Sequence, residues 1–495
     1  MSSPCYDRRV ASLSTPLRTT LAPVRQAERA AVPAGRVLTV VSLGYLLASW
    51  AMNPVSAILP TIATDLAIDV ARAGWVMNAY FLLLVGWVLI AGRLGDAFGH
   101  GTVFRAGCLV FAAGSLLGAL PGDYPMLLAG RAVQGLGSAM LFGTSLALVT
   151  AAYQGRRLGW AVGILAVSSG ASSLIGVWLN TALVQQVDWH WTFLVPAMLG
   201  ATAAMLGRGL PAARRARASE VDWPGGGLLF GALVLLLLGL NHLHDGPETF
   251  EAGAPYHLSM HLAALGLLAA FLWRQARAAR PLVPLRALRN ARLTTGVVAN
   301  GIAHSSMLAT GLLIPFLLER GRGYSPSQTA QLVLAMQVSL IVASYGGGWL
   351  YARHNTPAIA GTSLGAIAGG LLFLGRVGAD LPLPALFPLV AVLGAGLGSF
   401  TAANNTAVMA AAPADQRGFA SGLVEMTRQL GHSLGVSVSS SVLPARLATA
   451  GVPSLGYRDG FAEAASVMGL VSATGVLCVL LPRLRQRWRA RTPAG

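Results

Sequence analysis

The side chains of this sequence that could carry chemistry are the few ionisable ones inside long apolar runs. Glu425 is the one carboxylate well inside a predicted helix, about 12 Å from the nearer end of that helix. Arg428 follows three residues later and therefore lies on the same helical face. Arg131 lies about 9 Å inside another predicted helix. A charge at this depth in a membrane is costly, so each of these residues is a candidate for function.

Two interpretations of these charges stay open. Glu425 binds and releases a proton, or it forms an ion pair with Arg428 that neutralises both side chains. Arg131 controls proton movement or contacts an anionic group of a substrate, or it is a structural residue that bonds backbone carbonyls between helices. We expect proton coupling at Glu425 and Arg131.

Polar and aromatic residues within the apolar runs are the candidates for binding a solute. His304 and His432 either titrate near neutral pH or are neutral and hydrogen-bonded. Tryptophan and tyrosine also anchor helices at membrane interfaces, so an aromatic residue alone does not identify a binding site. The predicted substrate-binding residues are Arg131, Arg428, Asn53, Trp50, Tyr80, Asn300, His304 and Asn404.

Residue sets typical of enzymes and metal sites are missing from the sequence. It has no P-loop, no HExxH, no GxSxG and no plausible nucleophile–base set. His242, His244 and Asp245 are close together, but they precede an acidic loop and are interpreted as solvated. The three cysteines are scattered and indicate no disulfide framework. We therefore expect no enzyme activity, no catalytic residue, no metal and no cofactor.

A short segment rich in glycine and charge, Gly92–Phe104, joins two of the apolar runs. Asp96 stands near the end of the first run, where it can pair with Arg93 or Arg105 or accept hydrogen bonds from the N-terminus of a neighbouring helix. Opening on one side of a membrane would break such contacts. The predicted gating residues are Asp96, Arg93, Gly92 and Gly99.

The elements that must position these side chains are long apolar helices. Of the 495 residues, 54% are hydrophobic and only 11% are charged, whereas soluble domains carry roughly 25% charged residues. Apolar runs of about 20 residues recur, and each is long enough to cross about 30 Å of hydrocarbon. Backbone groups in lipid must be satisfied within the segment. The sequence predicts an all-α polytopic membrane protein with about 14 transmembrane helices.

The longest loops divide these helices into two six-helix bundles plus two extra central helices. The first 36 residues are rich in Arg, Ser and Pro and lack the apolar core of a secretory signal, so we expect a disordered cytoplasmic tail there. The expected segments are this tail (1–36), an N-terminal bundle (37–208), a linker with the two extra helices (209–292), a C-terminal bundle (293–482) and a basic cytoplasmic tail (483–495).

Arginines predict the orientation of the chain. The formal net charge is +17, but the basic residues sit in short loops and tails between apolar runs, which argues against nucleic acid as a partner. Most loop arginines fall on one side, and the positive-inside rule then places both termini in the cytoplasm of a multi-pass cell-membrane protein. The expected partners are the lipid bilayer, a small-molecule substrate and protons, with the protein as a monomer.

Several motifs resemble the fourteen-helix drug:proton antiporter branch of the major facilitator superfamily, and they occur in the order of that branch. The resemblance implies a transporter with two bundles around a central site. It runs from about residue 45 to 480. The motifs include ILPTIATDL (58–66), GRLGDAFG (92–99), GRAVQGLGSAM (130–140) and RGFASGLVEMTRQLGHSLGV (417–436).

Some motifs of that branch are eroded in this sequence. Ala51 lies in the first predicted helix, near 37–59, at the position where the resemblance implies a proton-coupling Asp. In the fifth predicted helix, near 157–180, serine pairs at 168–169 and 172–173 replace the Gly-Pro pairs that the resemblance implies. His100 and Gly101 replace two basic residues that follow the Asp96 motif. Proton coupling would therefore rest on other residues.

The leading functional hypothesis is proton-coupled efflux of a small amphipathic drug or metabolite by alternating access. The scarcity of buried acids favours neutral or anionic substrates over lipophilic cations. One alternative keeps the fold but makes the protein a proton-independent uniporter or solute exchanger. Another makes it a non-transporting membrane receptor or a degenerate relative.

Overall fold

The computed structural model describes residues 32–120, 122–153, 156–211, 221–240, 250–279, 281–354, 358–412 and 417–491, and helices dominate this part of the chain. Twelve helical segments among these residues are long and apolar enough to cross a membrane, which confirms an all-α polytopic membrane protein. They involve α1 (Ala34–Trp50) with α2 (Asn53–Ser56), α4 (Val70–Phe98), α5 (His100–Ala119), α6 (Tyr124–Ala152), α7 (Arg156–Gln186), α9 (Trp223–Leu240), α10 (Phe250–Arg277), α11 (Ala291–Pro315), α12 (Pro326–His354), α13 (Ala358–Phe373), α14 (Leu383–Ala411) and α16 (Pro453–Arg491).

Two further helices lie in the bundle, and each fails one of the two criteria for a membrane span, which are length and apolar composition. The first, α8 (Trp191–Leu206), is apolar but has only 16 residues. The second, α15 (Arg417–Thr449), has 33 residues, but its polar side chains lower its mean hydropathy. The helix α8 packs on α5, and α15 packs along α11, α4 and α16. By length and composition, twelve segments in the described residues therefore qualify as candidate membrane spans, whereas about fourteen were expected.

The first predicted helix, 37–59, is not continuous in the structure. The pieces α1 and α2 are separated at Ala51 and Met52, and α3 (Leu59–Asp65) follows. Pro54 and Pro60 lie in the first turns of α2 and α3. A proline has no backbone N–H and disfavours the helical conformation of the residue before it, so the chain turns at each one. The break leaves the carbonyl of Ala51 outside a regular helical hydrogen-bond pattern.

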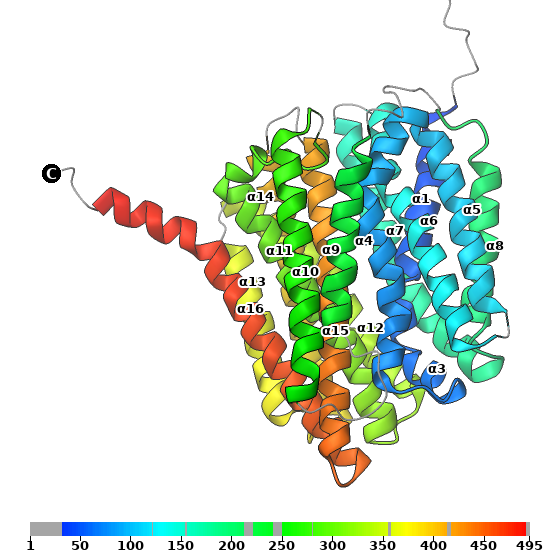
Figure 1. The fold of residues 1–495 in the computed structure, drawn as a ribbon, viewed down its shortest axis with the longest axis vertical. Coiled ribbons are helices and arrows are strands. Elements are labelled where there is room, and N and C mark those ends of the chain that lie inside the picture. Colours follow the sequence, from blue (N-terminus) through cyan, green and yellow to red (C-terminus); the bar gives the residue numbers. More distant parts are fainter. Residues whose placement is uncertain are drawn as a thin grey trace, which may run out of the picture.

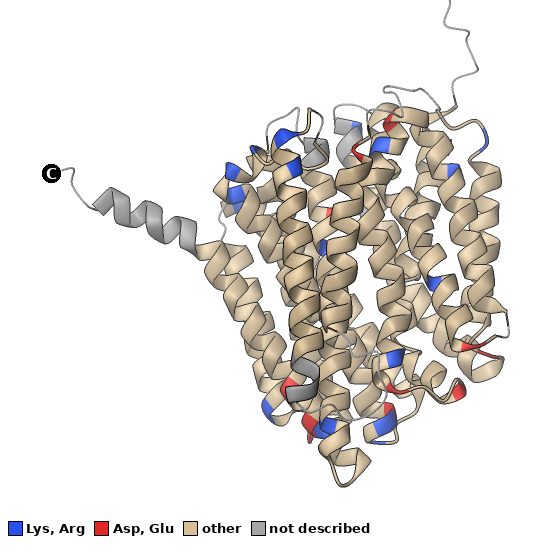
Figure 2. Ribbon diagram, viewed as in Figure 1, with Lys and Arg blue, Asp and Glu red and all other residues tan. Residues whose placement is uncertain are grey.

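Helices α1 and α4 to α8 pack among themselves, and α11 to α16 form a second group (Figure 1). We call these groups the N-half and the C-half. The hairpin of α9 and α10 lies where the halves meet, because α9 contacts α4 of the N-half and α15 of the C-half. Figure 2 shows that most charged residues lie at the two ends of the bundle and that few lie in its middle. This distribution is what a hydrocarbon layer requires.

A buried carboxylate links the two helices of the α9–α10 hairpin. The side chain of Asp222 is 4% exposed. Its Oδ1 accepts hydrogen bonds from the backbone N–H of Gly225 at 3.0 Å and from Nε of Arg274 at 2.7 Å, and its Oδ2 accepts one from Gln275 at 2.8 Å. Burial by itself raises the pKa of Asp222, but these hydrogen bonds and the charge of Arg274 outweigh burial and hold the pKa below its usual value.

We expect Asp222→Asn to lower the thermal stability of the detergent-solubilised protein by about 1–3 kcal/mol, because one buried acceptor becomes a donor and the ion pair is lost. The contribution of Asp222 is present above the unfolded pKa and is lost as the pH falls through the lower folded pKa. The difference between wild type and variant should therefore shrink in acid. The control is Asp123→Asn at the start of α6, where an Asn caps a helix about as well as an Asp does. Equal melting of wild type and Asp222→Asn would contradict the linking role.

Candidate functional site

Arg131 is fully buried within the N-half and is held by three neighbouring groups. Its Nε donates to the carbonyl of Val76 at 2.8 Å, one terminal nitrogen donates to Oε1 of Gln134 at 2.5 Å, and the other donates to the carbonyl of Ala51 at 2.8 Å. The guanidinium also lies 4.6 Å from the centre of the Tyr80 ring. Arg131 therefore ties α6 to α4 and to the broken end of α1.

The surroundings of Arg131 bear directly on its two interpretations. No ion pair to a carboxylate is formed by Arg131 among the described residues, and the position expected for such an acid is occupied by Ala51, whose carbonyl is bonded instead. Gln134 in turn donates to Ser115 on α5 at 2.7 Å. This geometry is that of a structural arginine bonding carbonyls between helices.

Glu425 and Arg428 form an ion pair in the first half of α15, close to the contact between the two halves. Arg428 donates to Oε2 of Glu425, while Gln429 donates to Oε1 at 2.6 Å. The side chains of Glu425 and Arg428 are 14% and 22% exposed. Arg428 also donates to the hydroxyl of Tyr45 at 3.2 Å. Tyr45 belongs to α1, so the charge pair of the C-half is bonded to the N-half.

Two histidines extend this polar cluster toward α11. His432 lies one turn beyond Arg428, and its Nδ1 is 3.2 Å from Oε1 of Gln429. The ring of His304, on α11, meets that of His432 edge to face with centroids 5.2 Å apart. Asn300 donates to the carbonyl of Val424 at 2.9 Å. The structure thus brings together Glu425, Arg428, Asn300 and His304 from the predicted set, and it separates Arg131 from them.

Tyr45 and Gln429 belong to this cluster and were missed in the sequence. Gln429 lies four residues after Glu425 and three before His432, a helical spacing that could have identified it. Tyr45 comes from a helix 383 positions away in the chain. No sequence pattern indicates that contact.

The predicted gating residues meet at the junction of α4 and α5. Asp96 lies 4.0 Å from a terminal nitrogen of Arg93, as one of the expected pairings requires, and Nε2 of His100 lies 3.2 Å from Oδ1 of Asp96. Gly99 has a φ of 92°, which favours glycine. A Cβ on Gly92 would lie 3.4 Å from the carbonyl of Gly143. His100, at a position where the resemblance implies a basic residue, contacts the same carboxylate.

The other predicted substrate-binding residues are engaged within one half. Trp50 donates to Asn180 of α7 at 3.2 Å, Tyr80 donates to the carbonyl of Ala48 at 2.7 Å, and Asn404 donates to the carbonyl of Gly296 at 3.0 Å. Asn53 lies on α2, and its side chain is outside the described residues. The His242, His244 and Asp245 cluster is also outside them.

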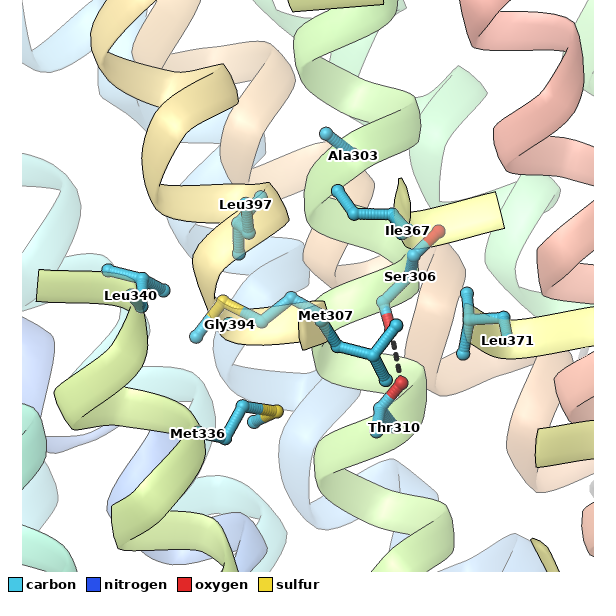
Figure 3. A pocket seen from close by; sticks show the side chains of 11 residues that line it. Ala303, Ser306, Met307, Thr310, Met336, Leu340, Ile367, Leu371, Gly394 and Leu397 are labelled. Carbon is cyan, nitrogen blue, oxygen red and sulfur yellow. Dashed lines mark hydrogen bonds between the residues drawn. The ribbon is translucent and has the colours of Figure 1, made fainter. Parts of the chain in front are cut away.

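A small apolar cavity lies within the C-half between α11, α12, α13 and α14 (Figure 3). Met307 and Met336 border it, and Thr310 donates to the carbonyl of Ser306 at 2.8 Å beside it. Its volume is about 10 Å³, which is room for roughly one water molecule. This cavity does not accommodate a drug-sized compound.

Comparisons with known proteins agree on one family and one fold. The model of the Major Facilitator Superfamily matches residues 41–436. The lincomycin resistance protein of Streptomyces lincolnensis is 30% identical over 488 residues, covering 94% of this chain and 95% of that protein. The riboflavin transporter RibZ of Clostridioides difficile (strain 630) is 25% identical over 407 residues, covering 82% and 87%. A bacterial homolog of the human lysosomal transporter Spinster, solved in an inward-facing and unoccupied conformation, superposes with a TM-score of 0.66 at 13% identity, covering 93% of this chain and 99% of that one.

We expect Arg131→Lys to destabilise the protein by about 3 kcal/mol, because a lysine cannot reach the Val76 and Ala51 carbonyls and Gln134 together. Thermal unfolding in detergent measures the effect. The control is Arg446→Lys, at an exposed pair with Glu463, where little change is expected. A variant at position 131 that melts like the wild type would favour the other interpretation, in which Arg131 meets protons or a substrate.

Proposed function

The chain belongs to the major facilitator superfamily, and we propose that it exports a small amphipathic compound across the cell membrane in exchange for protons. It is a transporter and not an enzyme. Relatives that include the lincomycin resistance protein and the puromycin resistance protein of Streptomyces alboniger, 30% identical over 462 residues, support export of a drug or metabolite. The riboflavin transporter among the relatives supports an aromatic, uncharged solute as readily as a drug.

The observation that carries the proposal is the Glu425–Arg428 pair beside Tyr45. Glu425 accepts hydrogen bonds from Arg428 and Gln429. A proton arriving on Glu425 removes its charge and releases Arg428 from the ion pair. Arg428 also bonds the Tyr45 hydroxyl of the N-half, so the same event loosens a contact between the halves. Proton binding is thereby coupled to the movement that alternating access needs.

We also propose how the protein is arranged in the membrane. The helices α8 and α15 would cross it as well, giving fourteen spans in bundles at 37–208 and 293–482 with the linker 209–292 between them. A helix of 16 residues is about 24 Å long, which is short but close to the hydrocarbon thickness. The positive-inside rule places both termini in the cytoplasm. The protein would work as a monomer.

We propose that this conformation of the transporter is closed on the extracellular side. Asn78 donates to Ser437 and accepts from Ser433, and Arg320 donates to the carbonyl of Pro60. These bonds join the halves in the part of the bundle near α3, which is opposite to the Asp96 junction. Asp96, Arg93, Gly92 and Gly99 would then form part of the inside gate, whose contacts change when the inside closes.

Glu425→Gln should abolish proton-linked transport in proteoliposomes, because a glutamine keeps the shape of the side chain but carries no titratable proton. Export of a compound identified in an efflux-deficient host is measured with and without a pH gradient. The matched control is Glu463→Gln, which makes the same substitution in the exposed pair with Arg446 and should leave coupling intact. Coupling that persists in Glu425→Gln would remove Glu425 from the mechanism.

Proton-independent uniport or exchange is the second candidate, and one observation favours it. The carbonyl of Ala51 satisfies Arg131 at the position where the resemblance implies a titratable acid. If wild-type flux is the same with and without the pH gradient, this second function replaces the first.

A further inference from the structure

The helices α11 and α15 lie in direct backbone contact along the polar cluster. A Cβ on Gly431 would lie 2.2 Å from the carbonyl oxygen of Gly301, and one on Gly435 would lie 2.0 Å from that of Ser305. Such distances leave no room for a side chain at either glycine. The polar residues beside them are therefore held at fixed positions along this seam.

Three buried polar atoms on this seam have no hydrogen-bond partner among the described residues. They are Oδ1 of Asn300, Nε of Arg428 and Nε2 of His432. The residue Asn300 is fully buried and His432 is 4% exposed. Native proteins leave few such atoms unpaired, and each one indicates a missing partner. Three such atoms lie on this one seam.

The partners already made fix which of these atoms donate and which accept. The carbonyl of Val424 accepts only, so the nitrogen of the Asn300 amide faces it and Oδ1 is left as an acceptor. A carboxylate also accepts only, so Gln429 turns its nitrogen to Glu425 and its oxygen to His432. Nδ1 of His432 must then carry the hydrogen. In the neutral imidazole, Nε2 is left as an acceptor.

Among the described residues, the seam therefore holds two unpaired acceptors and one unpaired donor. Asn300 and His432 supply the acceptors, and Nε of Arg428 supplies the donor. Arg428 and His432 are four residues apart, so their side chains lie on the same face of α15. The ring of Phe81, from the N-half, lies 5.7 Å from that of His432. An aromatic surface thus adjoins the unpaired atoms.

We propose that Asn300, Arg428 and His432 form the specificity-determining part of the substrate site, for an aromatic compound that is neutral or anionic and carries both a hydroxyl or N–H donor and a separate carbonyl-type acceptor. The donor of the compound meets His432 and Asn300, and its acceptor meets Arg428. Lipophilic cations are disfavoured, because Arg428 is positive and Glu425 is occupied by Arg428 and Gln429. The inference rests on the proposed transport function and names its substrate class.

The test uses two fluorescent probes that differ only in the donor. 4-Methylumbelliferone has a hydroxyl and a lactone carbonyl on opposite edges of a planar ring system, and 7-methoxy-4-methylcoumarin has a methyl ether in place of the hydroxyl. Equilibrium dialysis against the purified full-length protein in nanodiscs, at about pH 6 and without a proton gradient, gives a Kd for each. We expect wild type to bind the hydroxyl compound at least tenfold more tightly, because a site built around a donor rejects an analogue without one.

Three variants separate the subsite from general folding. His432→Phe keeps a ring but removes the acceptor, and it should bring the ratio of the two Kd values to about one. His432→Gln retains an acceptor oxygen and should restore part of the preference. Ser439→Ala is the control, because Ser439 lies on the same helix, seven positions beyond His432, and its buried hydroxyl has no partner among the described residues. It should leave the preference unchanged.

The proposal is overturned if wild type binds both probes equally or binds neither, which would mean that the three atoms bind water only, or if His432→Phe keeps the preference. Binding is measured without a gradient, so it is independent of proton coupling. A tenfold preference with no coupled transport would contradict the proposed function and support the subsite. Coupled transport with no preference would do the reverse.

Discussion

The energetic cost of a charge in hydrocarbon determines how this transporter holds its few buried ionisable side chains. Two arrangements satisfy the buried arginines. Arg131 is surrounded by neutral acceptors of its own half. Arg428 has a carboxylate and, in addition, a hydroxyl from the opposite half. Only the second arrangement can be altered by a single proton, because neutralising Glu425 leaves Arg428 without its counter-charge.

The break in the first helix connects these two arrangements. The first helix ends at Trp50, shortly before Pro54, and the carbonyl of Ala51 accepts a hydrogen bond from Arg131. A backbone carbonyl cannot titrate, so the arginine is satisfied without proton chemistry. The same helix carries Tyr45, two turns earlier, to the pair on α15. The proton coupling that we propose therefore rests on the C-half, while Arg131 bonds neutral groups within the N-half.

Prediction from the sequence was strongest for the helices and weaker for the site. Long apolar runs predicted an all-helical membrane protein, and Arg131 does lie within a long helix, Tyr124–Ala152. The first helix was expected as one segment near 37–59, but the structure breaks it at Ala51 and Met52. Glu425 and Arg428 form the ion pair that was one of their two interpretations, since residues three apart share a helical face. The number of spans was not settled by hydropathy, because α15 carries the polar residues that the site needs.

The sequence by itself determined that this protein lies in a lipid bilayer and that its fold is helical. It also determined the short list of side chains able to carry charge inside it. These properties follow from local composition and spacing. Only the tertiary structure decided which of those side chains meet. Arg131 lies with Val76 and Ala51, whereas Arg428 lies with Tyr45, and His304 lies against His432. Such contacts join helices distant in the chain, and their geometry depends on how close two backbones approach, which the sequence pattern of a single helix does not contain.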